Sequence, residues 1–570
     1  MFTRFSILVL ACVMIFSACN KQEGDTISED VKKMEADYKV FYDSITGQIS
    51  AAYTNQALAY FEASIKSNKE NWDKVNAYDV AMNQILSNKD TFVKIRNFKE
   101  SGFLKDSLLQ RSADVLYNDF LSKQIDTTIL NQLSKMQSDI ELKYSNYRAK
   151  VGGVVYDDNQ IEDLLKNSTN QKQLEGVWKA HKDIGPLVQQ DILDLVKLRN
   201  KAAVELGFKN YHEMSLKLSD QNPDDVAKLF DELDNLTRDE FVRVKGEIDT
   251  YLAARHKTTP DKLMPWHYQN RYFQEAPKIY TVDHDLFYKD KDVVKLTEQY
   301  FTSINLPIEN LVSNSDLYPK DNKNQHAYCI NIDRNKRDIR VLCNVVNNSG
   351  WMETMMHEFG HANFENYFSD ELPWGLKSPA HIFTTEAIAM LFGRFALNPN
   401  WMQDMLKISD EEKNKIAEDT RKTLKLQQLV FSRWSQVMYR FEKSMYADPD
   451  QDLNKLWWDL VEKYQLIKRP EGRNNPDWAT KIHIATSPCY YHNYHLGELL
   501  ASQLYYTISE KVLKVNASDN PSFYGKGEVG NFLIKNIFNP GNRYYWNDMI
   551  ERATGEKLTA KYYAKQFVEN

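Results

Sequence analysis

Two histidines and a glutamate near the middle of the chain have the types and spacing of a catalytic zinc motif. The run His357-Glu358-Phe359-Gly360-His361 follows the pattern H-E-x-x-H. Residues four apart on a helix lie one turn apart on the same face, so both imidazoles could reach one Zn²⁺. Glu358 would project about 100° around the helix from His357 and could activate a water molecule. The pattern alone also fits a helix whose two histidines are exposed or hydrogen-bonded internally.

A candidate for a third ligand lies downstream, in an apolar segment with helix signals at both ends. Ser378 before Pro379 indicates the start of this helix, and Asn398-Pro399 indicates its end. Glu386 falls among the apolar residues between these signals. A carboxylate in such surroundings is costly unless it is paired or bound to a cation.

The expected metal site combines His357, His361 and Glu386, because a catalytic zinc has three protein ligands and one open position. We expect these three residues to hold one Zn²⁺. A salt bridge from Glu386 to Arg394 is the alternative explanation of the buried carboxylate. His381 is a weaker candidate for the third ligand.

Such a site points to the hydrolysis of peptide bonds. Zinc lowers the pKa of its water to about 7 and polarises the scissile carbonyl. Glu358 would take the proton of the water and pass it to the leaving amine. The oxyanion that forms needs further hydrogen-bond donors, worth about 3 kcal/mol each, and these must come from elsewhere in the chain.

The segments that must position these residues are mostly predicted helices. Roughly residues 30–255 contain a series of amphipathic segments, of which examples are Val31–Ile49, Gln56–Lys69, Asp191–Leu206 and Pro223–His256. Ser349 is the expected N-cap of the metal helix, and Asn347 or Asn348 would also serve. The sequence therefore predicts a mostly α fold.

One β-hairpin is predicted directly before the metal helix. Its arms, Ala327–Asp333 and Asp338–Val346, alternate or carry Ile and Val, and the basic turn Arg334–Arg337 separates them. Cys329 and Cys343 could pair across this hairpin, although their spacing does not demand a disulfide. We expect a single small sheet next to the metal helix.

The oxyanion donors can be sought between Lys481 and Tyr494, and in this stretch the chain resembles a known family. Lysine-x-histidine-isoleucine, then a proline and a pair of tyrosines, is similar to the angiotensin-converting enzyme family of peptidyl-dipeptidases. The metal motif matches too, with Glu386 following His361 by 25 residues, one more than in the family. The resemblance is continuous over roughly residues 160–550.

The resemblance implies a large helical zincin body that is split by a deep cleft, with lid helices within residues 30–150. It also implies that His483 and Tyr494 hydrogen-bond the substrate carbonyl or the oxyanion. The implied substrate-binding residues are Lys481, Tyr491 and Gln274 at the C-terminal carboxylate, and His326 and Ala327 at the substrate backbone. A carboxylate clamp two residues from the zinc would release dipeptides.

Departures from the family bear on the expected function. Asn493 stands where the family has an arginine tied to chloride activation, which puts chloride dependence at that site in doubt. Met390 replaces an aspartate that supports the first zinc histidine in the family, and it is the one feature that favours a catalytically silent peptide-binding lipoprotein. An oligopeptidase of the thimet type, which cuts internal peptide bonds, is a further alternative.

The first residues have the features of an export signal. A basic residue and a short apolar run within residues 1–18 lead to small residues before Cys19, which resembles a bacterial lipobox. This implies cleavage before Cys19 and lipidation of its thiol, and the alternatives are an ordinary signal peptide or a short membrane anchor. Residues 19–29 would form a polar tether, and residues 30–570 one metallopeptidase unit.

Charge and export together limit the partners. The formal net charge of -7 over 570 residues argues against nucleic acid as the main partner. The expected partners are a peptide substrate and, through the lipid anchor, a membrane. The expected location is that of an exported bacterial lipoprotein, in the periplasm or at the cell surface.

Overall fold

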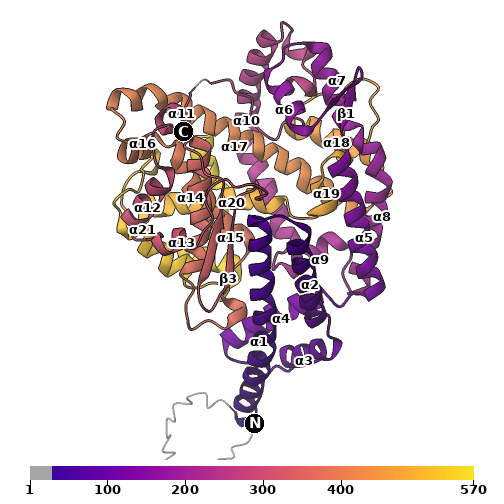
Figure 1. Ribbon diagram of the computed structural model, residues 1–570, viewed down its shortest axis with the longest axis vertical. Helices are drawn as coiled ribbons and strands as arrows, with labels where there is room; N and C mark the ends of the chain where they lie inside the picture. Colours follow the sequence, from indigo (N-terminus) through magenta and orange to yellow (C-terminus); the bar gives the residue numbers. More distant parts are fainter. Residues whose placement is uncertain (1–27, 281, 570) are drawn as a thin grey trace, which may run out of the picture.

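The computed structural model describes residues 28–280 and 282–569, and its architecture is mostly helical (Figure 1). It is 68% helical, and the β-structure of the described residues consists of two antiparallel sheets of two strands each. The predicted mostly α fold is confirmed. The leader and Cys19 lie outside the described residues. Within the described residues, no helix has both the length and the apolar character that crossing a membrane requires.

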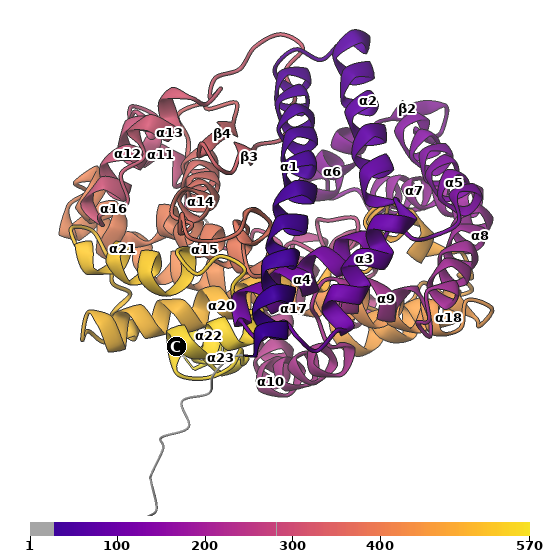
Figure 2. The same ribbon diagram turned by 90° about the horizontal axis from the view of Figure 1, so that it is seen from below.

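The first helices are grouped together and have a hydrophobic cluster of their own (Figure 2). They are α1 Glu29–Ile65, α2 Lys69–Leu86, α3 Lys89–Glu100 and α4 Ser107–Leu121, whereas α5 Thr127–Asn146 packs against α8 and belongs to the main core. The two helices expected within residues 31–69 are largely a single helix, because the residues between them, 50–55, include neither Gly nor Pro to interrupt α1. Tyr42 of α1 joins this group to the main body by accepting a hydrogen bond from the Gly375 backbone N–H at 3.0 Å.

A second small hairpin, which the sequence did not lead us to expect, follows these helices. Strand β1 Ala149–Val151 pairs with β2 Val154–Tyr156. Gly152 and Gly153 between them have φ of 57° and 86°. Two successive positive φ values are typical of the tightest hairpin turns, so the glycine pair closes a hairpin instead of merely separating two helices.

The rest of the chain builds the main body. Besides α14, α15 and α20, which are described below, its helices are α6 Asp158–Asn167, α7 Gln171–Lys182, α8 Ile184–Glu205, α9 Tyr211–Leu218, α10 Pro223–Arg255, α11 Asp285–Tyr288, α12 Val293–Ser303, α13 Glu309–Ser313, α16 Pro399–Leu406, α17 Asp410–Ala447, α18 Leu453–Leu460, α19 His483–Thr486, α21 Gly527–Leu533, α22 Trp546–Thr554 and α23 Lys561–Phe567. The predicted helix starting at Pro223 is confirmed, and Asn222 caps it through the backbone N–H groups of Asp224 and Asp225.

The predicted hairpin before the metal helix is confirmed. It consists of β3 Tyr328–Asp333 and β4 Asp338–Leu342, so its second arm is shorter than expected. Cys329 lies opposite Val341 in the register, and Cys343 follows the end of β4. Both thiols are free, so the disulfide that the spacing allowed is not formed.

Two helices carry the expected metal ligands, and both begin at caps. Helix α14, Ser349–Asn366, starts after Asn348, whose side chain accepts the Trp351 N–H at 2.8 Å, so Asn348 is the N-cap rather than Ser349. Helix α15, Ile382–Gly393, starts later than the Ser378-Pro379 signal indicated. The reason is that Nδ1 of His381 accepts the Phe383 N–H at 3.2 Å and caps the helix there.

Helix α15 packs between α14 and α20, His492–Tyr506, and glycines allow the close approach on both sides. A Cβ at Gly360 of α14 would lie 3.0 Å from Ala389 Cα, and one at Gly497 of α20 would lie 3.3 Å from Glu386 Cβ. Side chains larger than glycine would push the helices apart. This packing brings Glu386 against the histidines of α14.

Candidate metal centre and active site

Three side chains from α14 and α15 converge on one point. Nε2 of His357 and Nε2 of His361 are 3.3 Å apart, and Oε2 of Glu386 is 3.7 Å from the first nitrogen and 3.8 Å from the second. Ligand atoms bound tetrahedrally to Zn²⁺ at about 2.0–2.2 Å lie about 3.4 Å from one another, so this spacing fits zinc. Within residues 28–280 and 282–569, no other group of three His, Cys, Asp or Glu side chains meets this way.

The two imidazoles are neutral, as metal binding requires. Burial lowers the pKa of His357 to about 4. Burial, followed by the neighbouring His357, holds the pKa of His361 well below its usual value. Nδ1 of His361 lies 2.7 Å from the hydroxyl of Thr385, a partner that orients the ring so that Nε2 faces the other two side chains.

Neither alternative from the sequence, a Glu386–Arg394 salt bridge or His381 as the third ligand, agrees with the structure. Arg394 forms its ion pair with Glu498 of α20 and not with Glu386. His381 uses its Nδ1 as the cap of α15 and does not belong to the converging group. Burial, followed by the charge of Glu498, raises the pKa of Glu386 to about 7. A cation at this point would offset the cost of holding the carboxylate there.

Glu358 lies beside the metal ligands and is buried. Burial raises its pKa to about 8, the charge of Glu386 adds to the increase, and a hydrogen bond with the Cys329 backbone opposes it. That backbone contact places Glu358 between the metal helix and strand β3. The charge of Glu386 acts on this carboxylate, so Glu358 is near the expected metal ligands, where a proton acceptor for hydrolysis is needed.

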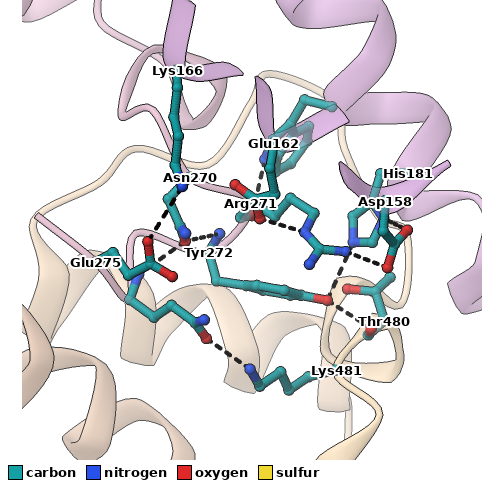
Figure 3. Close-up of polar contacts among 12 residues, drawn as sticks. Asp158, Glu162, Lys166, His181, Asn270, Arg271, Tyr272, Glu275, Thr480 and Lys481 are labelled. Carbon is teal, nitrogen blue, oxygen red and sulfur yellow. Dashed lines mark hydrogen bonds and ion pairs between the residues drawn. The ribbon is translucent and has the colours of Figure 1, made fainter. Parts of the chain in front are cut away.

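The expected carboxylate clamp is assembled from segments of the chain that are 207 positions apart. Nζ of Lys481 donates a hydrogen bond to Oε1 of Gln274 at 2.7 Å (Figure 3). The same nitrogen lies 5.4 Å from the ring centroid of Tyr491. Burial lowers the pKa of Lys481 to about 7, and the positive charge of Arg271 contributes. The structure thus brings together the three residues that the resemblance assigned to the substrate carboxylate.

The two expected oxyanion donors are linked to this clamp through Tyr491. The ring of His483 is 5.3 Å from that of Tyr491, which is 5.4 Å from that of Tyr494. Burial raises the pKa of Tyr494, and the charge of Glu386 adds to the increase, so Tyr494 is close to the metal ligands. Burial also lowers the pKa of His483 to about 4, so this imidazole is neutral.

A set of polar contacts that we did not predict holds the clamp (Figure 3). Arg271 donates to Asp158 and Glu162 of α6, at 2.6 Å in each case. Tyr272 donates its hydroxyl hydrogen to the backbone carbonyl of Thr480 at 2.7 Å. These bonds fix the loop that carries Gln274 and the residue before Lys481. No motif marks Arg271 or Tyr272, so sequence reasoning had no signal for them.

His326 and Ala327 come directly before β3 and are not part of the strand. His326 is exposed, and Ala327 packs against the main core. Strand β3 pairs only with β4 among the described strands, so its other edge has no strand partner. An extended peptide can add to such an edge.

The two departures from the family pattern have structural consequences. Asn493 accepts a hydrogen bond from the side-chain amide of Gln221 at 2.7 Å, and both side chains are buried. Met390 lies at the α15–α20 contact, where its Sδ would be 3.2 Å from a Cβ at Gly497. Thr385 supports His361, but the structure gives no carboxylate partner to either histidine besides Glu386 within the described residues.

Comparison with known proteins gives one result that covers nearly the whole chain. A family model described as angiotensin-converting enzyme matches residues 32–268 and 271–567. A search of curated proteins finds no match. The family consists of zinc-dependent metallopeptidases with peptidyl-dipeptidase activity. The chain therefore belongs to the angiotensin-converting enzyme family, and it is a zinc-dependent peptidase.

Proposed function

We propose that His357, His361 and Glu386 bind one zinc ion and that Glu358 is the general base of peptide hydrolysis. The observation that supports this most strongly is the convergence of three ligand atoms within 4.8 Å of one another. The neutral imidazoles and the spacing of the ligand atoms fit this ion. When bound, the zinc supplies Lewis acidity, which lowers the pKa of water and polarises a carbonyl.

The residues around the ion would perform the proton transfers. Glu358 takes a proton from the attacking water and later delivers it to the amine of the leaving peptide. Tyr494 and His483 donate hydrogen bonds to the oxygen of the scissile carbonyl as it gains negative charge. Each can do so because a neutral phenol has an O–H group and a neutral imidazole has one N–H group.

The clamp would determine where the peptide is cut. Lys481, Gln274 and Tyr491 bind the C-terminal carboxylate. The ring of Tyr491 contacts that of Tyr494, which joins the clamp to an oxyanion donor. A substrate fixed at its C-terminus presents the second peptide bond from that end, which gives dipeptides. We further propose that the substrate backbone pairs with the segment His326-Ala327 and the open edge of β3.

Blocking the substrate's C-terminus tests this binding mode. We expect an unblocked oligopeptide to yield C-terminal dipeptides, and the same peptide with a C-terminal amide to be a much poorer substrate. The amide removes the charge that Lys481 binds, and mass spectrometry of timed digests measures both results. Equal cleavage of both peptides at internal bonds would instead support an oligopeptidase.

The variant Lys481→Met tests the clamp residue itself. We expect KM for the free-carboxylate peptide to rise about 10–100-fold with little change in kcat, because the lost charged hydrogen bond exists in ground and transition states alike. The amidated peptide is the control, and its KM should not change. An unchanged KM for the free peptide would remove Lys481 from the binding site.

We propose that the enzyme is an exported bacterial lipoprotein, anchored by a lipid on Cys19. The support is the sequence alone: small residues precede this cysteine directly after a short apolar run. We expect Cys19→Ser to abolish incorporation of labelled palmitate and to release the protein from the membrane fraction, with Cys12→Ser as the matched control. Labelling of Cys19→Ser at the parent level would rule out this anchor.

A further inference from the structure

A cavity of about 430 Å³ lies away from the metal centre. It is bounded by the end of α15, the 3₁₀ turn Arg394–Leu397, the first half of α17, and α23. None of the residues assigned above to the metal, the general base, the oxyanion or the clamp lines it. Its size lies within the range of about 300–1,000 Å³ that is common for small-molecule sites.

The charged residues around this cavity all have one sign. Its lining includes Arg394, Lys413, Arg421 and Lys425, and among the described residues it includes no Asp or Glu. Two of these cations, Arg394 and Lys425, form the inner pair and have acidic partners of low exposure, since Arg394 pairs with Glu498 and Lys425 pairs with Glu240 at 2.6 Å. Neither of these acids lines the cavity.

The two outer cations, Lys413 and Arg421, differ from the inner pair because their acidic partners are exposed. Nζ of Lys413 donates a hydrogen bond to Oε1 of Gln403 at 2.7 Å, and its acidic partner, Asp410, is 3.5 Å away with an 82% exposed side chain. Arg421 is 3.0 Å from Glu418, and both side chains are about half exposed. Exposed ion pairs of this kind are worth about 0–1 kcal/mol, so a ligand anion can replace the acidic partners at little cost.

Lys413 and Arg421 flank Ala417 on one face of α17. Each is four residues from Ala417, which is one helical turn. Ala417 lines the cavity and has only a methyl group, so the space above it, between the two cations, is not filled by its own side chain. A single carboxylate there could contact both cations.

Part of the cavity wall is apolar. It includes Leu391, Phe395, Leu424 and Phe567. Such a wall suits hydrocarbon better than ordered water, which needs two to four polar partners. The cavity thus has two cations with exposed acidic partners at its outer end, and apolar side chains together with the ion-paired Arg394 and Lys425 farther in.

We propose that this cavity binds a free carboxylate with an extended apolar body, with the carboxylate over Ala417 between Lys413 and Arg421 and the apolar part against Phe395 and Phe567. This ligand class matches the cavity, because a negative charge would face the two outer cations and a hydrocarbon chain would face the apolar side chains. The site is separate from peptide hydrolysis, because Leu391 lies five residues after Glu386 and so points about 140° around α15 from it.

Calorimetric titration of the full zinc enzyme with decanoate tests the proposal. We expect saturable binding to the parent enzyme, none to Ala417→Trp, whose indole would fill the space over α17, and parent-like binding to the matched control Lys415→Trp. Lys415 is on the same helix but does not line the cavity. Decanoate that bound at the zinc instead would bind Ala417→Trp normally, and this result would overturn the proposal, as would no saturable binding to the parent.

A second experiment tests whether binding requires the negative charge of the carboxylate. The double variant Lys413→Gln/Arg421→Gln should weaken decanoate binding by about tenfold or more, because charged hydrogen bonds are lost. Decanol, which has the chain without the charge, should bind the parent no better than this variant binds decanoate. Equal binding of decanoate to parent and double variant would contradict the proposed carboxylate site. Peptide turnover of Ala417→Trp, which should equal that of the parent, separates this outcome from any failure of the peptidase assignment.

Discussion

Glu358→Gln is expected to lower kcat by about 10²–10⁴-fold while the protein keeps its zinc. Gln has nearly the shape of Glu but cannot accept the proton of the attacking water at neutral pH. Glu358 does not belong to the three converging ligands, so its replacement leaves the ligand set intact. Steady-state peptide hydrolysis, together with zinc content by atomic spectroscopy on the same sample, measures both effects.

Glu353→Gln is the matched control for this variant. Glu353 lies on the same helix, one turn before His357, and is not among the converging side chains. We expect it to retain both zinc and turnover. If Glu358→Gln hydrolyses peptides at the parent rate, Glu358 is not the base, and if it loses zinc, its role is in the metal site.

Glu386→Ala should have the second large effect, a loss of affinity for zinc. Two imidazoles from one helix would remain, without the only ligand that comes from α15. Loss of an outer hydrogen-bond partner typically costs about 10–100-fold in metal affinity, and loss of a direct ligand should cost more. Competition with a chelator of known affinity measures the change, and hydrolysis should fall in parallel with zinc occupancy.

Two controls show whether Glu386→Ala keeps its fold and whether its loss of zinc affinity comes from the missing ligand. Circular dichroism should show the same helical content as the parent, because Glu386 forms no ion pair with Arg394 that its loss would break. Thr385→Val, which removes only the partner of His361 Nδ1, should weaken zinc binding less than Glu386→Ala does. Parent-like zinc affinity in Glu386→Ala would exclude this residue as a ligand.

The sequence predicted the metal ligands because their geometry is local. His357 and His361 lie one turn apart on any helix, and Glu386 stood out as a carboxylate among apolar residues. The clamp is different, since Lys481 and Gln274 are far apart in the chain. Only the resemblance to a family brought them together, and the residues that hold the clamp, such as Arg271, carried no signal at all.

Element boundaries were predicted less well, for reasons that are specific to each residue involved. Helix α15 begins at a histidine cap, and histidine is not a preferred N-cap residue, so the serine before Pro379 was the stronger signal. Helix α1 continues through residues 50–55 because nothing there interrupts it. The short strands on either side of Gly152-Gly153 were not predicted, since three residues are too few to show an alternating pattern.

The most direct test of the metal centre is a crystal structure of the purified enzyme with anomalous diffraction recorded at the zinc absorption edge. We predict one strong zinc peak that lies about 2.0–2.2 Å from Nε2 of His357, Nε2 of His361 and a carboxylate oxygen of Glu386. A zinc peak elsewhere, or one that lacks Glu386 among its ligands, would contradict the proposed metal centre.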